Sequence, residues 1–343
     1  MVYLLIAVFV VSLLVAVGAS VFFTRRLENI SDLFSFSPGL LSWLGALGAN
    51  IPNYVSALTA MISGQAEVGI GIIIGSNIYN IAVILGISAF ASPARQGIAI
   101  PQQEARDARQ VGMFTLAIMV TTGLAAGFFS WKVSPSIPHQ LTLPVSITLL
   151  ALNLLSLGLF AALSAHMLRR PTPVLSKNVA RHADPVERAL SPRGWKIGRV
   201  LGEIVIALGI ALGGVIVMVQ AGQAAAADIH LPRAILSLVI LAVATSLPNT
   251  AVALTLAHTG RASASVEEVF SSNSVNAALG LALPLLFWSG IQSDPLLIIL
   301  DAPLMIALIS VALLCVSRRR VSRPVGLLLV MVYAGWIIIH VLL

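Results

Sequence analysis

The chain has 343 residues, of which 58% are hydrophobic and only 10% are charged, and its mean hydropathy is +0.98. Soluble globular domains carry about 25% charged residues, so this composition excludes a water-soluble enzyme, a disordered protein and a disulfide-stapled secreted module. Cys315 is the only cysteine, which excludes an intramolecular disulfide and a cysteine metal cluster. The formal charge of +7 is compatible with nucleic-acid binding or with basic loops at the cytoplasmic face of a membrane.

Apolar runs long enough to cross a bilayer, which takes about 20 residues, recur along the whole chain. In chain order they are 2–23, 39–62, 67–92, 112–131, 142–168, 198–220, 231–257, 266–290, 295–316 and 324–343. The first has no Lys or Arg before its apolar run, so we interpret it as an uncleaved helix and not as a secretory signal. The sequence therefore predicts an all-α integral membrane protein with ten transmembrane helices.

The basic residues test this helix count, because cytoplasmic loops are enriched in Lys and Arg. With ten crossings, the loops on one side of the membrane hold 18 of the 20 basic residues, and the other side holds only Lys132 and Arg233. This asymmetry predicts a multi-pass protein of the cell membrane with both termini outside. It also explains the net charge without a nucleic-acid partner.

The longest polar stretch, 169–197, contains four prolines and mixed charge, as linkers often do. It predicts a cytoplasmic basic linker between two five-helix halves, 1–168 and 198–343. Because each half has an odd number of helices, the second half is expected to enter the membrane inverted relative to the first.

An internal repeat lies at an offset of 196 residues, within the motif regions 45–86 and 241–282. When 50–86 is aligned without gaps to 246–282, 12 of the 37 pairs are identical. The identities include polar, Pro and Gly positions, which shared apolar composition does not explain. They include Pro52/Pro248, Asn53/Asn249, Gly64/Gly260, Ser76/Ser272, Asn77/Asn273 and Asn80/Asn276.

Inverted repeats with proline-interrupted helices at matching positions point to the central binding site of a transporter. Pro52 and Pro248 are each expected to remove an intrahelical hydrogen bond near mid-membrane and to free a backbone carbonyl. The residues expected to line a substrate or ion site are Asn50, Asn53, Ser76, Asn77, Asn80, Thr245, Ser246, Asn249, Ser272, Asn273 and Asn276. The alternative is that these side chains only hold neighbouring helices together.

The motifs Ser246-Leu-Pro-Asn249 and Gly75-Ser-Asn-Ile-Tyr-Asn80, with their counterparts in the other half, resemble the alpha-repeats of the cation/calcium exchanger superfamily. The resemblance covers 39–92 and 231–290 by motif and the remainder by topology. It implies secondary antiport by alternating access, in which helices one and six slide over a core of helices two, three, seven and eight.

The chain departs from the family at the innermost positions. The family usually carries Glu directly after the two prolines, where this chain has Asn53 and Asn249. Some members end the Gly-Ser-Asn motif with Asp, where this chain has Asn80 and Asn276. Because calcium takes six to eight oxygen ligands and its affinity follows the number of charged ones, a neutral site suits Na+, another monovalent ion or a polar organic molecule better.

Four acidic residues outside these positions are candidates for coupling or for an acidic vestibule: Glu67, Glu203, Glu267 and Glu268. Glu203 could instead pair with Arg199, four residues earlier. Asp301 is expected one or two turns into helix nine, with no partner identifiable, and Trp336 and His340 fit interfacial positions. The sequence predicts no cofactor, no catalytic residue and no certain metal site.

We therefore expect a secondary active antiporter for cations, coupled to Na+ or H+, and the neutral site leaves open whether calcium is a substrate. A gradient-driven exporter of a small organic solute is the alternative within the same fold. A transport-inactive membrane scaffold or sensor is the alternative from another class. The expected partners are the transported cation or solute and the lipid bilayer, and the sequence leaves the oligomeric state open.

Overall fold

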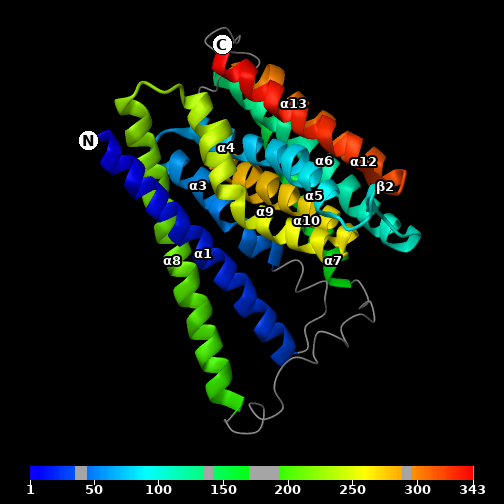
Figure 1. Ribbon diagram of the computed structural model, residues 1–343. Helices are drawn as coiled ribbons and strands as arrows, with labels where there is room; N and C mark the ends of the chain where they lie inside the picture. The colour runs from blue at the N-terminus through cyan, green and yellow to red at the C-terminus, as the bar shows by residue number, and fades with distance from the viewer. Residues whose placement is uncertain (35–44, 134–141, 170–192, 288–294, 343) are drawn as a thin grey trace.

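The computed structural model describes residues 1–34, 45–133, 142–169, 193–287 and 295–342, and these are almost entirely helical (Figure 1). The α-helices are α1 Val2–Phe34, α3 Ile51–Ile62, α4 Ala66–Tyr79, α5 Gly86–Ala91, α6 Gln102–Val133, α7 Thr142–Arg169, α8 Arg193–Asp228, α9 Ala242–His258, α10 Ala262–Val275, α11 Leu283–Leu285, α12 Ala302–Ser317 and α13 Arg323–Leu342. The π-helical turns are η1 Asn80–Leu85, η5 Ile235–Leu241, η6 Asn276–Ala282 and η7 Leu297–Asp301.

Each of the ten predicted apolar segments is mainly helical where the structure describes it. Within the described residues, eight helices are long and apolar enough to cross a membrane. The second and eighth predicted segments are not among these eight; their described helices are α3 and α10–η6–α11. Parts of these two segments, 39–44 and 288–290, lie outside the described residues, as does most of the predicted linker. The chain therefore has an all-helical membrane fold with at least eight apolar helices.

The two motif regions share their local structure. The turns after α3 and α9 each contain a glycine in the left-handed region, Gly64 at φ 78° and Gly260 at φ 79°, which glycine adopts at little cost. In each turn the next residue donates its N–H to a carbonyl five residues back, and both N···O distances are 2.9 Å. The following helix passes into a π-helical turn that begins at Asn80 in one region and at Asn276 in the other.

The two prolines act differently from each other. The first motif helix is interrupted at Asn50 (φ −93°, ψ 0°), and α3 begins with Pro52 as its second residue. This agrees with the tolerance of proline in the first turn of a helix. Pro248 instead lies inside α9, which continues through it from Ala242 to His258. The helix is therefore broken near Pro52 only, while Pro248, which has no N–H, leaves the carbonyl four residues earlier without its helical donor.

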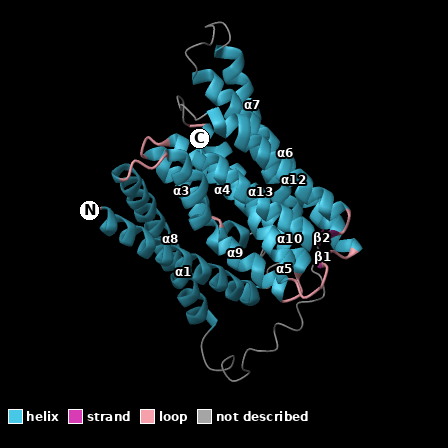
Figure 2. Ribbon diagram, turned by 45° about the horizontal axis from the view of Figure 1, so that its top comes forward, coloured by secondary structure: helices cyan, strands magenta, loops and turns pink. Residues whose placement is uncertain are grey.

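The helix α4 lies at the centre of the bundle, where its apolar side chains are almost completely buried. The long helices α1 and α8 pack against each other along one side of the molecule (Figures 1 and 2). An apolar cluster that includes Ala16, Ala60 and Val215 joins this pair to α3 and α4. The polar motif residues thus lie inside the bundle, behind the α1–α8 pair.

Close packing at Gly75 holds α4 against η5. A Cβ atom at Gly75 would lie 2.3 Å from the backbone oxygen of Leu238 and 2.9 Å from the Cβ of Ala242. We expect Gly75→Ala to lower the free energy of unfolding by about 1–3 kcal/mol, because the backbones must separate. Denaturation of the purified protein in detergent measures this. Gly158→Ala on α7 is the control, since no atom lies within 4 Å of its Cβ; equal stability of the two variants would contradict the packing.

A short antiparallel sheet, which the sequence did not predict, joins two loops. Strand β1 (Gly97–Ala99) follows α5, and strand β2 (Arg320–Ser322) lies between α12 and α13. Gly97 pairs with Ser322 and has φ +100°, and a Cβ there would lie 2.3 Å from the Val321 oxygen. The sheet therefore fixes two distant loops at the same end of the bundle.

Candidate functional site

The eleven residues expected to line the site all lie in the interior of the bundle, each with 0% of its surface exposed. They come from the start of α3, the α4–η1 junction, the middle of α9 and the α10–η6 junction. In that order they are Asn50 and Asn53; Ser76, Asn77 and Asn80; Thr245, Ser246 and Asn249; and Ser272, Asn273 and Asn276. Segments separated by about 200 residues in sequence therefore meet at one polar cluster.

Asn50 is the hub of this cluster. Its Oδ1 accepts hydrogen bonds from Asn53 Nδ2 at 3.2 Å and from Asn249 Nδ2 at 2.7 Å. Its Nδ2 donates to Ser272 Oγ at 3.0 Å and to the backbone oxygen of Ala46 at 2.7 Å. One amide thus connects α3 directly to α9 and α10.

Further amide contacts join the two motif regions symmetrically. Asn80 Nδ2 donates to Asn273 Oδ1 at 2.9 Å, and Asn276 Nδ2 donates to Asn77 Oδ1 at 3.2 Å. The two contacts are equivalent under the repeat, because Asn80 corresponds to Asn276 and Asn273 corresponds to Asn77. Asn53 Nδ2 also donates to Asn276 Oδ1 at 3.2 Å. We call these five asparagines, together with Asn50 and Asn249, the amide network.

The atoms of the amide network that have no partner at all among the described residues are oxygens. Each of its seven side-chain nitrogens donates to an oxygen or to the sulfur of Met305. In contrast, Asn53 Oδ1, Asn80 Oδ1 and Asn249 Oδ1 have no hydrogen-bond partner among the described residues, and neither has Ser246 Oγ. A buried acceptor without a partner costs about 1–3 kcal/mol, so these oxygens are available to a ligand or to water. The complementary ligand is one that binds oxygen, such as a cation.

The remaining hydroxyls are hydrogen-bonded to backbone. Thr245 Oγ1 donates to the Leu241 oxygen at 2.8 Å, and Ser76 Oγ donates to the Ala242 oxygen at 3.4 Å. Met305 on α12 is a contact that the sequence did not reveal, with its sulfur 3.5 Å from Asn77 Nδ2. Nothing in the sequence marks this methionine, since it lies in an apolar helix. Only the packing of α12 against α4 brings it to Asn77.

The acidic candidates lie in different environments. Glu67 at the start of α4 is 3.8 Å from Arg233. Glu203 on α8 accepts from Arg199 and is paired with Arg26 of α1, each at 2.9 Å. Glu268 Oε1 accepts from Ser272 Oγ at 2.7 Å, and Glu267 is half-buried beside it. Glu268 is therefore the acidic candidate that is hydrogen-bonded to a predicted site residue.

A second buried polar group lies at the η7–α12 junction. Asp301 Oδ1 accepts from Trp336 Nε1 at 2.7 Å and lies 2.9 Å from His340 Nε2, both on α13. Asp301 is 0% exposed, Trp336 2% and His340 5%. Trp336 and His340, which were expected at the membrane interface, thus turn their polar atoms into the bundle, toward the carboxylate of Asp301.

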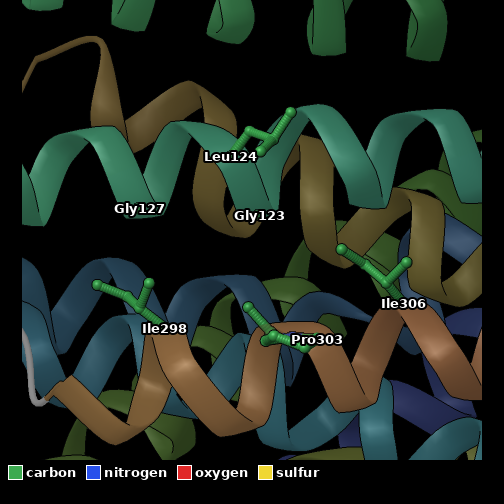
Figure 3. A pocket seen from close by; sticks show the side chains of 7 residues that line it. Gly123, Leu124, Gly127, Ile298, Pro303 and Ile306 are labelled. Atoms are coloured by element: carbon green, nitrogen blue, oxygen red, sulfur yellow. The ribbon is translucent and has the colours of Figure 1, made fainter.

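An apolar groove of about 320 Å³ lies between α6 and the η7–α12 segment (Figure 3). Gly123 and Gly127 form one wall, and Ile298, Pro303 and Ile306 form the other. No side chain lining it carries a hydrogen-bonding group, so it offers no ligand to a cation. Over the described residues there is also no group of three or more His, Cys, Asp or Glu side chains able to hold a metal.

Comparison with known proteins agrees with this fold. The 295 residues that align with the inner membrane protein YrbG of Escherichia coli (strain K12) are 26% identical and cover 85% of this chain and 82% of YrbG. The sodium/calcium exchanger MaX1 of Methanosarcina acetivorans is 29% identical over 92 residues, 26% of each chain.

Solved structures of the sodium-calcium exchanger NCX_Mj have the same fold. The form soaked with 10 mM Na+ and zero Ca2+ matches with a TM-score of 0.64 at 19% identity, covering 97% of this chain and 98% of that one. The form soaked with 10 mM Na+ and 10 mM Sr2+ matches with a TM-score of 0.63 at 20% identity, covering 97% of each chain.

The family described as Sodium/calcium exchanger protein matches residues 4–162 and 200–342, which is most of the chain. Members of this family are membrane transporters for ions and are not enzymes. The resemblance found in the two asparagine-containing motifs is therefore confirmed, and this chain belongs to the sodium/calcium exchanger protein family.

Proposed function

We propose that this protein is a secondary active antiporter that binds a monovalent cation, with Na+ as the first candidate, in the amide network. The observation that carries the proposal is the set of three buried amide oxygens without hydrogen-bond partners, Asn53 Oδ1, Asn80 Oδ1 and Asn249 Oδ1. Carbonyl-type oxygens are the ligands that hard cations prefer. In this orientation the three oxygens are available to such an ion.

The chemistry of the network favours a monovalent over a divalent ion. Calcium binding in proteins depends on carboxylates, and no carboxylate belongs to the amide network itself. The names of the relatives MaX1 and NCX_Mj refer to sodium and calcium exchange. Sodium, common to both names, is the ion that a network of neutral oxygens accommodates.

Contacts between distant loops support ten crossings as two inverted five-helix halves, with both termini outside. The sheet β1–β2 joins two loops that the charge pattern assigns to the cytoplasm. Ser263, beside another such loop, donates to Glu104, near the first of them. Glu67 and Arg233, which pair with each other, are both assigned to the outside. Each contact joins loops expected on the same face of the membrane.

Alternating access then requires a part that moves past the amide network. The α1–α8 pair is suited to this, because it lies along one side of the bundle (Figure 2) and the Arg26–Glu203 ion pair ties its members together. In this scheme the pair exposes the network to one side of the cell membrane at a time, and residues 169–197 connect the halves in the cytoplasm.

Cation binding to the purified protein tests this proposal. The thermal midpoint is measured in detergent at constant ionic strength while choline is replaced by Na+, K+ or Ca2+. A ligand at about ten times its Kd stabilises the folded state by about 1.4 kcal/mol, so we expect the midpoint to rise with Na+. No response to any cation would contradict the proposal and favour the organic-solute or scaffold alternatives. Stabilisation by micromolar Ca2+ alone would contradict the monovalent assignment.

A further inference from the structure

Glu268 introduces a carboxylate next to a network that is otherwise neutral. Its Oε1 accepts from Ser272 Oγ, one helical turn later, at 2.7 Å, and its Oε2 is buried without a hydrogen-bond partner among the described residues. No described cation forms an ion pair with it. The residue at the same place in the first repeat is Ile72, which is fully buried in an apolar cluster. The carboxylate is thus a feature of one repeat only.

The donor and acceptor pattern leads from Glu268 to the hub of the network. A serine hydroxyl has a single hydrogen, and an ionised carboxylate can only accept. Ser272 Oγ therefore gives its hydrogen to Glu268 and can only accept from Asn50. Asn50 accordingly presents Nδ2 to Ser272 at 3.0 Å, and its second amide hydrogen goes to the Ala46 oxygen.

The orientation of Asn50 in turn sets that of its two neighbours. With Nδ2 occupied, Asn50 offers Oδ1 to Asn53 and Asn249, and both donate to it through Nδ2. Their own Oδ1 atoms are then left as two of the acceptors without a partner. If Ser272 instead donated to Asn50, the reversed amide would attract the oxygens of Asn53 and Asn249 and withdraw them from a ligand.

We propose that Glu268 is a positioning residue of the cation site, which orients the oxygens of Asn53 and Asn249 through Ser272 and Asn50 and supplies one negative charge. This inference rests on the proposed function and adds the charge class of its substrate. A single carboxylate near a set of neutral oxygens balances the charge of a monovalent cation. It leaves part of the charge of a divalent cation without compensation.

A double-mutant cycle on Na+ affinity tests the inference, with Kd taken from the thermal midpoint in detergent. We expect Glu268→Gln, which keeps the acceptor and loses the charge, to weaken Na+ binding about tenfold, equivalent to about 1.4 kcal/mol. Because the effect passes through Ser272, E268Q should add little once Ser272 is replaced by alanine. A purely structural role would lower the midpoint in choline and leave the two effects additive.

Two further variants complete the test. Glu268→Asp keeps the charge but shortens the reach to Ser272, and it should also weaken Na+ binding; it serves as well if E268Q does not fold. Glu104→Gln removes a carboxylate that is hydrogen-bonded to Ser263 of the same helix α10, and it should leave Kd unchanged. Unchanged Kd in E268Q or E268D, or additivity with Ser272→Ala, overturns the inference alone. A wild-type protein without any Na+ response overturns the proposed function as well.

Discussion

Replacing Asn53 and Asn249 together with alanine is expected to abolish sodium exchange by the reconstituted protein. The change removes two of the three amide oxygens that have no hydrogen-bond partner among the described residues. It also removes both donors to Asn50 Oδ1. If each oxygen ligand contributes about 1.4 kcal/mol, its loss weakens sodium binding about tenfold. We expect the two losses together to bring binding below the level needed for flux. Uptake of radioactive sodium into proteoliposomes measures the effect.

The matched control for this variant is Asn153→Ala. Asn153 is a fully buried asparagine of α7 that has no hydrogen-bond partner among the described residues and does not belong to the amide network. It therefore reports what the loss of a buried amide does outside the proposed site. Flux should be retained in N153A. Equal flux in the control and in the N53A/N249A protein would show that the network only holds helices together.

Asp301→Ala is expected to lower the free energy of unfolding by about 2–6 kcal/mol, because each of two buried hydrogen-bonding groups that loses its partner costs about 1–3 kcal/mol. The alanine leaves Trp336 Nε1 and His340 Nε2 without the carboxylate oxygen that both contact, at 2.7 and 2.9 Å. These contacts tie η7 to α13 across the interior. Denaturant titration of the purified protein in detergent, followed by tryptophan fluorescence, gives the change.

The double variant Asp301→Leu/His340→Leu tests how much of this loss of stability comes from the contact between Asp301 and His340. Replacing both members of a buried pair by apolar residues of similar size is often neutral, so the part of the loss that belongs to His340 should return, while Trp336 Nε1 stays without its acceptor. A single D301A variant as stable as the wild type would contradict this assignment. So would a double variant that is less stable than D301A, since the pair would then not account for the loss.

Much of the helical structure was predictable because long apolar runs leave few alternatives in a membrane. The cluster at Asn53, Asn80, Asn249 and Asn276 was predictable for another reason: polar residues repeated at one offset must meet if the two halves pack about a common axis. The structure does bring these side chains together inside the bundle, with direct contacts such as Asn53 to Asn276.

The features that the sequence did not reveal depend on how helices rotate and pack. Asp301, Trp336 and His340 look separate in the sequence, and only the packing of η7 against α13 makes them partners. The π-helical turns at Asn80 and Asn276 carry no residue signature, because any amide can make the wider hydrogen bond. Glu268 and Ser272 have a visible four-residue spacing, but the link from Ser272 to Asn50 joins residues 222 positions apart.

Sodium counterflow in proteoliposomes tests whether this protein carries sodium by alternating access. Vesicles containing the purified protein are loaded with unlabelled Na+ and diluted into a trace of radioactive sodium, with empty vesicles and N53A/N249A vesicles alongside. An alternating-access carrier returns with an outside ion after delivering an inside one, so we expect uptake of labelled sodium that rises with the internal Na+ concentration. Uptake no greater than in empty vesicles, or uptake of calcium but not of sodium, would contradict it.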